Sequence, residues 1–248
     1  MNSISPNLNI MIKACEKASK VIIRDFGEIE NLQVKKKGPR DFVTKTDKKV
    51  EGILIEELTK AKKNFSFLTE ESGKIENNDK DKIWIIDPID GTTNFLHGVP
   101  HFAISLALKI DSELKSALIV DPIKNEIFFA EKNNGSYLNN RRIRVSNKND
   151  IEDCLFSSDQ TGLKNIFPKL NMRTTGCAAL DLAYVGSGRM DGFFYNNINI
   201  WDIAAGVLIV KEAGGTTNDI GNYEDDNIDI RAASSAIYPE MMKKLINF

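Results

Sequence analysis

The sequence predicts an α/β protein built from layers of helices and sheets. Short apolar runs typical of strands fill the middle of the chain, whereas segments near both ends place apolar residues at helical spacing. The 248 residues contain no internal repeat, low-complexity tract or obvious linker. This length suits one large domain or two closely packed halves. We therefore expect helices to lie between or outside sheets.

Two amphipathic helices are expected in the N-terminal part. Residues 6–27 repeat apolar residues at helical spacing and end near Gly27, and residues 47–62 separate an apolar side from a side of Lys and Glu. Asp47 lies at the start of the second helix, where a carboxylate can cap free N–H groups, and this structural role competes with a catalytic one. The basic segment 33–41 is predicted to be a loop whose lysines are mostly solvated.

A series of short strands is expected after the second helix. Their shared feature is a run of apolar residues bounded by turn-forming residues. These runs are 65–68, 83–86, 102–109, 114–121, 127–130, 142–145, 154–158 and 192–195. Asparagines predict turns at 133–135, which also contains a glycine, and at 139–140.

Helices return in the C-terminal part, where residues 177–185, 202–213 and 239–246 are predicted to be helical. The helix at 202–213 is apolar on most sides, which predicts burial between layers. The glycines at 214–215 supply its end.

The chain is expected to form one continuous unit with two halves. A soft boundary falls near residues 134–147. Residues 1–138 are assigned to an N-terminal α+β half that carries most of the acidic residues discussed below. Residues 139–248 form the C-terminal α/β half, which supplies Asp202 and the substrate pocket. We do not expect the halves to move independently.

Composition and charge exclude several classes of protein. The formal net charge of −2 gives no general attraction to nucleic acid, so a nucleic-acid partner is not expected. The three cysteines are far apart and form no CxxC pair, so we expect small buried side chains rather than disulfides or a zinc site. The N-terminus does not resemble a signal peptide, and no run of about 18 apolar residues occurs. We therefore expect a cytoplasmic protein without a membrane span.

Four acidic residues lie where predicted buried elements end. Glu70 and Asp87 each follow an apolar run, and Asp90 lies three residues after Asp87. Asp202 begins an apolar helix. Each has a structural alternative: Glu70 beside Glu71 as a solvated turn charge, Asp90 as a turn residue and Asp202 as a helix cap. Such positions can also converge at one edge of a layered fold, and that is our hypothesis.

Converging carboxylates require a cation, because burying unpaired charges is costly. The only histidines, His97 and His101, have Pro100 between them, which weakens a helical ligand pair. A site with oxygen ligands alone favours a hard divalent cation, and we expect Mg²⁺, which commonly binds substrate phosphate. Gly91 would let backbone N–H groups approach a phosphate, and Thr92 adds a hydroxyl that can orient water.

The ordered set of motifs resembles the inositol monophosphatase family. The matching segments are Asp41-Phe42-Val43-Thr44-Lys45-Thr46-Asp47, Glu70-Glu71-Ser72, Asp87-Pro88-Ile89-Asp90-Gly91-Thr92-Thr93-Asn94-Phe95, Trp201-Asp202-Ile203-Ala204-Ala205-Gly206 and Gly214-Gly215. The resemblance spans nearly the whole chain. It implies an α-β-α-β-α sandwich sugar-phosphatase fold, Mg²⁺-dependent and lithium-sensitive hydrolysis of a small phosphate monoester, and a homodimer.

The resemblance also implies a set of metal ligands. Glu70, Asp87 and the backbone carbonyl of Ile89 would hold one Mg²⁺. A second ion would be held by Asp87, Asp90 and Asp202. A third, weaker ion would involve Glu70, so the family pattern implies two or three ions.

Catalytic and phosphate-binding roles follow from the same resemblance. Glu70 would help to activate the attacking water, and Thr92 and Asp47 would form an orienting hydroxyl–carboxylate pair. Gly91 and Thr92 would bind phosphate through their backbone N–H groups. The implied reaction is in-line hydrolysis without a covalent enzyme intermediate.

The substrate side departs from the family pattern. Gly176, Cys177 and Ala178 fall where the family contacts the inositol ring. Inositol-hydrolysing members often carry a glutamate seven residues before the motif aspartate Asp202, and that position here is Tyr195. A carboxylate acceptor for sugar hydroxyls is thus replaced by an aromatic ring that can stack or donate a hydrogen bond.

The identity of the substrate alcohol therefore stays open. Inositol monophosphate or a similar polyol phosphate is the first expectation. Histidinol phosphate, fructose 1,6-bisphosphate and 3′,5′-nucleotide bisphosphates, which related families use, are the alternatives. A non-enzymatic alternative is a regulatory protein that binds the transcription machinery, as some bacterial relatives look able to do, but the intact acidic set favours catalysis.

Overall fold

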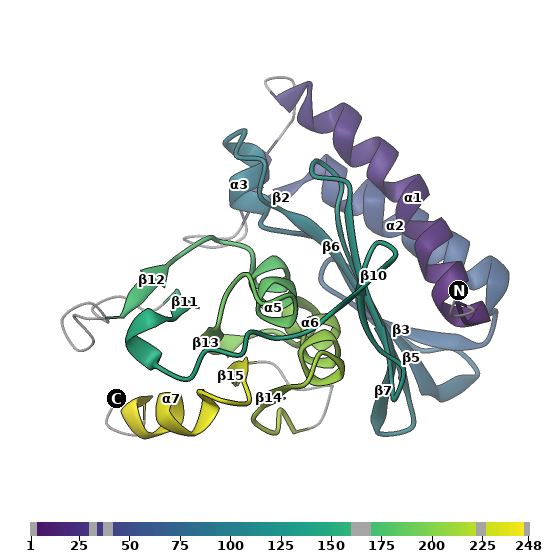
Figure 1. Cartoon of the computed structure of the whole chain (residues 1–248). Helices are drawn as coiled ribbons and strands as arrows, with labels where there is room; N and C mark the ends of the chain where they lie inside the picture. Colours follow the sequence, from purple (N-terminus) through teal and green to yellow (C-terminus); the bar gives the residue numbers. More distant parts are fainter. Residues whose placement is uncertain (1–3, 30–33, 37–41, 160–169, 222–226, 246–248) are drawn as a thin grey trace.

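The computed structural model describes residues 4–29, 34–36, 42–159, 170–221 and 227–245. Two large sheets and the helices around them form five layers in the order helix, sheet, helix, sheet, helix (Figure 1). This arrangement confirms the predicted α-β-α-β-α sandwich. No helix in these ranges combines the length and the apolar character that crossing a membrane requires.

The first layer consists of α1 (Pro6–Phe26) and α2 (Lys45–Ala61), which pack against each other. Helix α1 begins after Ser5, whose hydroxyl accepts a hydrogen bond from the N–H of Leu8 at 3.2 Å. Both predicted helices are confirmed, although α2 begins two residues before Asp47. That residue therefore lies in the first turn of α2 instead of at its cap.

A short antiparallel pair joins these two helices. Strand β1 (Val34–Lys36) pairs with β2 (Phe42–Thr44). The prediction that residues 33–41 form a loop is therefore wrong for Val34–Lys36, because a partner strand further along the chain supplies their backbone hydrogen bonds. Residues 33 and 37–41 lie outside the described ranges.

The second layer is an eight-stranded sheet in the order β10-β9-β8-β7-β6-β5-β3-β4. Its strands are β3 (Phe65–Thr69), β4 (Gly73–Ile75), β5 (Asp79–Asp90), β6 (Ala103–Ile110), β7 (Glu113–Asp121), β8 (Glu126–Glu131), β9 (Gly135–Leu138) and β10 (Arg141–Ile143). Residues of β5 alternate between its faces: Trp84 and Ile86 pack with α1 and α2, whereas Ile83 and Ile85 pack with the central helices. The continuous apolar run before Asp87 reflects this burial on both faces.

The third layer contains α5 (Ala178–Gly186) and α6 (Ile200–Glu212), which lie between the two sheets (Figure 1). The predicted burial of the apolar helix at 202–213 is confirmed. Close packing of the two helices depends on Gly206, because a Cβ atom there would lie 2.4 Å from Cβ of Leu182.

The last two layers are a five-stranded sheet and a covering helix, α7 (Tyr238–Leu245). The sheet has the order β12-β11-β13-β15-β14 and consists of β11 (Leu155–Ser157), β12 (Asn171–Arg173), β13 (Gly192–Ile198), β14 (Gly215–Thr217) and β15 (Ile228–Ser234). A single turn of 3-10 helix, Ile151–Asp153, precedes β11.

The predicted strands all occur, with ends shifted by a few residues. Strands β4, β9, β12, β14 and β15 and the short helix α3 (Thr92–Leu96) were not predicted. Most of these are three or four residues long. The short strands β12 and β14 lack a clear apolar period, and pairing with β11 and β15 rather than local pattern creates them.

The chain passes from the eight-stranded sheet to the five-stranded sheet between β10 and β11. Strand β10 still pairs in the eight-stranded sheet, and β11 begins the five-stranded sheet. The division at residue 138 stays a prediction about folding units.

Candidate active site and metal centre

Two of the predicted metal ligands lie at the end of β5. Asp87 pairs with Ser105 of β6 and Asp90 pairs with Ala103, so Pro88 and Ile89 together oppose the single residue Ile104 and form a bulge. Proline cannot donate a ladder hydrogen bond, which suits this irregular position. The N–H of Ile89 donates to Oδ1 of Asp87 at 2.9 Å. The bulge thus redirects the strand end and fixes the Asp87 carboxylate.

The third predicted ligand, Asp202, lies on α6. Asn199 caps this helix, and Asp202, its third residue, completes a capping box by accepting from the N–H of Asn199 at 3.3 Å. The hydroxyl of Ser105 donates to the carbonyl of Trp201 at 3.0 Å, which ties the start of α6 to β6. Asp202 therefore has a structural role in the first turn of α6, although Asn199 and not Asp202 is the cap residue. Its role as a metal ligand stays a prediction.

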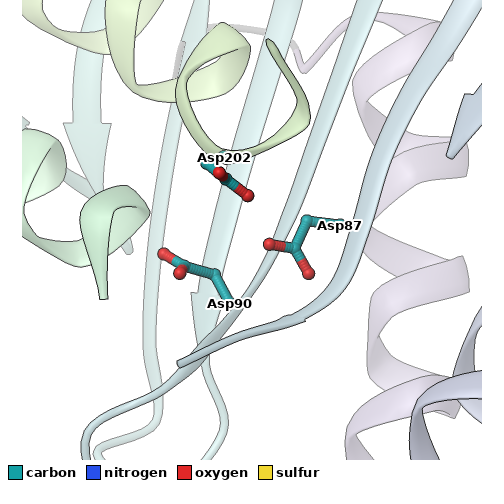
Figure 2. A group of neighbouring side chains, drawn as sticks. All are labelled: Asp87, Asp90 and Asp202. Carbon is teal, nitrogen blue, oxygen red and sulfur yellow. The ribbon is translucent and has the colours of Figure 1, made fainter. Parts of the chain in front are cut away.

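The three aspartates converge as predicted. Ligand oxygens of Asp87, Asp90 and Asp202 lie within 4.8 Å of one another, and the side chains point toward a common centre (Figure 2). Asp87 is 1% exposed. Only carboxylate oxygens are contributed, which is the donor set that a hard divalent cation prefers.

Glu70 joins this group through strand pairing. Strand β3 runs parallel to β5, with Thr69 beside Ile86, and the N–H of Glu70 donates to the carbonyl of Ile86 at 3.2 Å. Thr69 and Ile86 are neighbours across the sheet, so Glu70 and Asp87, the next residue of each chain segment, lie at the same height. Burial, followed by the charge of Asp202, raises the pKa of Glu70 to about 8. The nearby charge of Asp47, which is 2% exposed, contributes to this rise in the pKa.

The other carboxyl groups are also hard to ionise. Burial, and then the charges of Glu70 and Asp90, raise the pKa of Asp87 well above its usual value. Burial raises the pKa of Asp90 to about 7. Desolvation and mutual repulsion both disfavour the charged forms, so a divalent cation placed among these oxygens would relieve both effects. The residues present thus fit a metal centre.

In the absence of metal, the protein is expected to lose stability as the pH rises from about 4 to about 8. Burial raises the pKa of Glu70 from 4.5 to about 8 and that of Asp90 from 3.8 to about 7. Across this interval the folded protein binds more protons than the unfolded chain, so the free energy of unfolding falls with increasing pH.

Chemical denaturation in a chelator at about pH 5 and about pH 8 measures this slope. Asp90→Asn removes one of the titrating groups and should flatten the slope. A slope that is the same in the wild type and the variant would contradict the expectation. Mg²⁺ should restore more stability at the higher pH, where the ligands have lost their protons.

The predicted phosphate-binding turn lies directly after Asp90. Gly91 has φ of 92° and precedes α3. A Cβ at Gly91 would lie 3.0 Å from the carbonyl oxygen of His101 and 3.2 Å from that of Gly176. Both the conformation and the crowding require glycine here. The first N–H groups of α3 have no acceptor within the helix, which leaves them available to an anion.

Thr92 is held close to another predicted ligand. Its hydroxyl donates to the carbonyl oxygen of Ile89 at 2.9 Å. The predicted pair of Thr92 and Asp47 would require the same hydroxyl proton to be donated to Asp47 instead of Ile89. That pairing stays a prediction. Asp47 itself lies near Glu70, since its charge affects the pKa of Glu70.

The predicted substrate-binding loop, Gly176–Ala178, lies against the phosphate-binding turn. Its place is fixed by Asn94, whose amide donates to the carbonyls of His101 and Thr175, both at 2.8 Å. Oδ2 of Asp90 accepts from the N–H of Ala179 at 2.6 Å and from the thiol of Cys177 at 3.1 Å. Hydrogen bonds therefore connect the loop, the turn and Asp90, which is a predicted metal ligand. Cys177 is buried, as are the other two cysteines, which confirms their predicted packing role.

Tyr195 is placed further inside than a typical substrate contact. The residue is 7% exposed, its ring stacks on Phe193 with centroids 4.5 Å apart, and its hydroxyl oxygen is buried. Burial, and then the charge of Asp181, raise its pKa. A substrate contact by Tyr195 stays a prediction.

Sequence reasoning missed a buried carboxylate behind this loop. Asp181 of α5 accepts hydrogen bonds from the hydroxyls of Ser157 at 2.5 Å and Thr175 at 2.8 Å. Burial raises its pKa to about 7. Asp181 therefore connects the five-stranded sheet to the loop that precedes α5. No local pattern distinguishes it from an ordinary helical aspartate, so the sequence offered no signal.

The fold and the acidic site together define a metal-dependent phosphatase that acts on phosphate monoesters. Comparison with known protein families supports this class: residues 4–247 match the model of the family described as "Inositol monophosphatase family". The chain belongs to the inositol monophosphatase family.

Curated relatives carry two different names. An inositol-1-monophosphatase of Mesorhizobium japonicum is 40% identical over 251 residues, covering 95% of this chain and 94% of the relative. A protein of Escherichia coli named Nus factor SuhB is 41% identical over 227 residues, covering 86% and 85%. The chain is thus about equally similar to proteins under both names.

A solved structure has the same fold over nearly the whole length of both chains. The extragenic suppressor protein suhB from Bartonella henselae superposes with a TM-score of 0.90 at 42% identity, covering 97% of this chain and 98% of that one.

Proposed function

We propose that this phosphatase uses Mg²⁺ to hydrolyse a small polyol or sugar phosphate, with inositol monophosphate as the first expected substrate. The convergence of Asp87, Asp90 and Asp202 beside Glu70 carries the proposal. An all-oxygen site with several negative charges suits Mg²⁺ and, through it, a phosphate ligand. The name of the Mesorhizobium japonicum relative supports inositol phosphate in particular.

The proposed ligands divide into two sets. Glu70, Asp87 and the carbonyl of Ile89 hold one ion, and Asp87, Asp90 and Asp202 hold a second. A third, weaker ion involves Glu70. Asp87 belongs to both sets, which agrees with its central and most buried place among the carboxylates.

The bound ions supply charge neutralisation, polarisation of the phosphate and a lowered pKa for the attacking water. Within the protein, Glu70 would accept the proton of that water as a general base. Thr92 and Asp47 orient the water. The N–H groups of Gly91 and Thr92 hold the phosphate oxygens in line for displacement.

The substrate alcohol is proposed to lie against Gly176, Cys177, Ala178 and the ring of Tyr195. The loop that carries the first three residues is fixed to the metal ligand Asp90. Tyr195 offers an apolar surface where a glutamate would offer an acceptor. Alcohols with fewer hydroxyl groups, including histidinol phosphate, therefore belong in any test beside inositol monophosphate, fructose 1,6-bisphosphate and 3′,5′-nucleotide bisphosphates.

A panel of these phosphate esters tests the proposal. Phosphate release is expected only with Mg²⁺, is expected to be inhibited by Li⁺, and is expected to be fastest with one monophosphate of the panel. Equal hydrolysis of all esters would contradict a specific polyol phosphatase. Absence of release from every ester would overturn the proposed enzyme function.

A regulatory role is the second candidate, because the Escherichia coli relative is named as a Nus factor. In this case the protein would bind the transcription machinery. A pull-down that recovers a stoichiometric protein partner, together with an inactive panel, would favour this candidate.

We further propose a homodimer in the cytoplasm, as the family resemblance implies. Light scattering coupled to size-exclusion chromatography measures the subunit number.

A further inference from the structure

Glu51 is a buried carboxylate of α2 that no motif includes. It lies one helical turn after Asp47, and each of the two residues is only 2% exposed. A buried carboxylate is costly unless hydrogen bonds compensate it. The groups that donate hydrogen bonds to the Glu51 carboxylate therefore indicate the role of this residue.

Two hydrogen bonds join Glu51 to the turn after Glu70. Its Oε2 accepts from the backbone N–H of Glu71 at 3.0 Å, and its Oε1 accepts from the hydroxyl of Ser72 at 2.5 Å. Hydrogen bonds to an ionised acceptor are stronger than neutral ones, and two of them on one carboxylate also fix direction. Glu51 thus joins α2 to the residues that immediately follow Glu70.

The same turn is fixed from its other side by the sheet. The N–H of Glu70 donates to the carbonyl of Ile86, the residue before Asp87, at 3.2 Å. Thr69 accepts from the N–H of Ser72 through its hydroxyl oxygen at 3.2 Å. Glu70 therefore lies between an attachment to β5 and an attachment to α2. Loss of the second attachment would leave the turn free to move Glu70 away from Asp87.

We propose that Glu51 is a positioning residue, which holds Glu70 at the metal centre by binding the Glu71 N–H and the Ser72 hydroxyl. The inference rests on the proposed function, because it assigns Glu70 to the metal ligands. Glu51 touches neither substrate nor metal in this proposal. Its effect is on how well the preformed site binds Mg²⁺.

Glu51→Ala, Glu51→Gln and a matched control, Glu56→Ala, test the proposal in the full-length protein. Glu56 lies on the same helix, but its side chain is 63% exposed and pairs with Lys60 at 2.5 Å. Mg²⁺ binding is measured by isothermal titration calorimetry, together with kcat, KM and the melting temperature. The calorimetric constant reports on the site without requiring turnover.

Glu51→Ala is expected to weaken Mg²⁺ binding by about tenfold and to lower kcat, with a smaller change in KM for the phosphate ester. Glu51→Gln should have a smaller effect, since the amide oxygen can accept from Glu71 while its NH₂ donates to Ser72. Glu56→Ala should match the wild type, because exposed ion pairs contribute little.

A folded Glu51→Ala protein with wild-type Mg²⁺ affinity, whatever its melting temperature, would overturn the inference alone. If that variant does not fold, Ser72→Ala removes one donor and is expected to weaken Mg²⁺ binding by about threefold; unchanged affinity there would equally overturn the inference. A wild-type protein that binds no Mg²⁺ would instead overturn the proposed function and this inference with it.

Discussion

Asp87→Asn is expected to lower kcat for Mg²⁺-dependent phosphate release by about 10³-fold while the fold is retained. Asp87 lies 1% exposed among the other acidic groups. A neutral amide keeps the shape of the side chain but removes the charge proposed to be shared by two ions. The same change removes like-charge repulsion, so the metal-free variant should melt at a higher temperature than the wild type near about pH 8.

Asp81→Asn is the matched control for this variant. Asp81 lies on the same strand but is exposed, so the chemical change is identical and the surroundings differ. Its rate and melting temperature should equal those of the wild type. Circular dichroism separates a loss of chemistry from a loss of fold. A folded Asp87→Asn protein with the wild-type rate of phosphate release would contradict the proposed metal-centre mechanism.

Gly91→Ala is expected to lower both stability and activity. The added Cβ would lie 3.0 Å from the His101 carbonyl, 3.2 Å from the Gly176 carbonyl and 3.3 Å from Cβ of Cys177, at a backbone φ of 92°. We expect a loss of about 1–3 kcal/mol in the free energy of unfolding. We also expect a fall of about 10²-fold in kcat/KM, because the turn must move relative to the metal ligands.

Gly214→Ala separates strain from displacement. Gly214, which follows the C-terminal end of α6, has φ of 86°, but a Cβ added there would meet nothing within 4 Å. This variant should lose about 1 kcal/mol of stability and keep its activity. Denaturant unfolding and steady-state kinetics of the two variants give the comparison. Equal activity losses in both would show that the crowding at Gly91 has no catalytic consequence.

The main elements of the fold and the acidic centre could be predicted because their signals are local. An apolar run that ends at Asp87 indicates a buried strand and a carboxylate at its end, and a helix that is apolar on most sides indicates the central layer. The family resemblance then connected Glu70, Asp90 and Asp202 before any distance between them was known. The structure places the three aspartates together and Glu70 beside Asp87.

What could not be predicted are single polar residues whose partners lie far along the chain. Asn94 binds the carbonyl of Thr175, Glu51 binds the turn after Glu70, and Asp181 binds the hydroxyl of Ser157. Each looks like an ordinary surface residue in its own segment, because nothing local indicates burial. The burial of Tyr195 has the same cause, since its ring stacks on Phe193 of the same strand.

The placement of α6 between the two sheets has a consequence for how the protein is made. Asp87 and Asp90 leave the ribosome well before Asp202, and Asp202 reaches them only when α6 has packed against the eight-stranded sheet. A partly synthesised chain therefore holds an incomplete and repulsive pair of carboxylates. In the proposed division of ligands, the ion held by Glu70, Asp87 and Ile89 needs no residue of α6. The ion held by Asp87, Asp90 and Asp202 would find its full ligand set only once α6 is in place, so its binding would stabilise the completed fold.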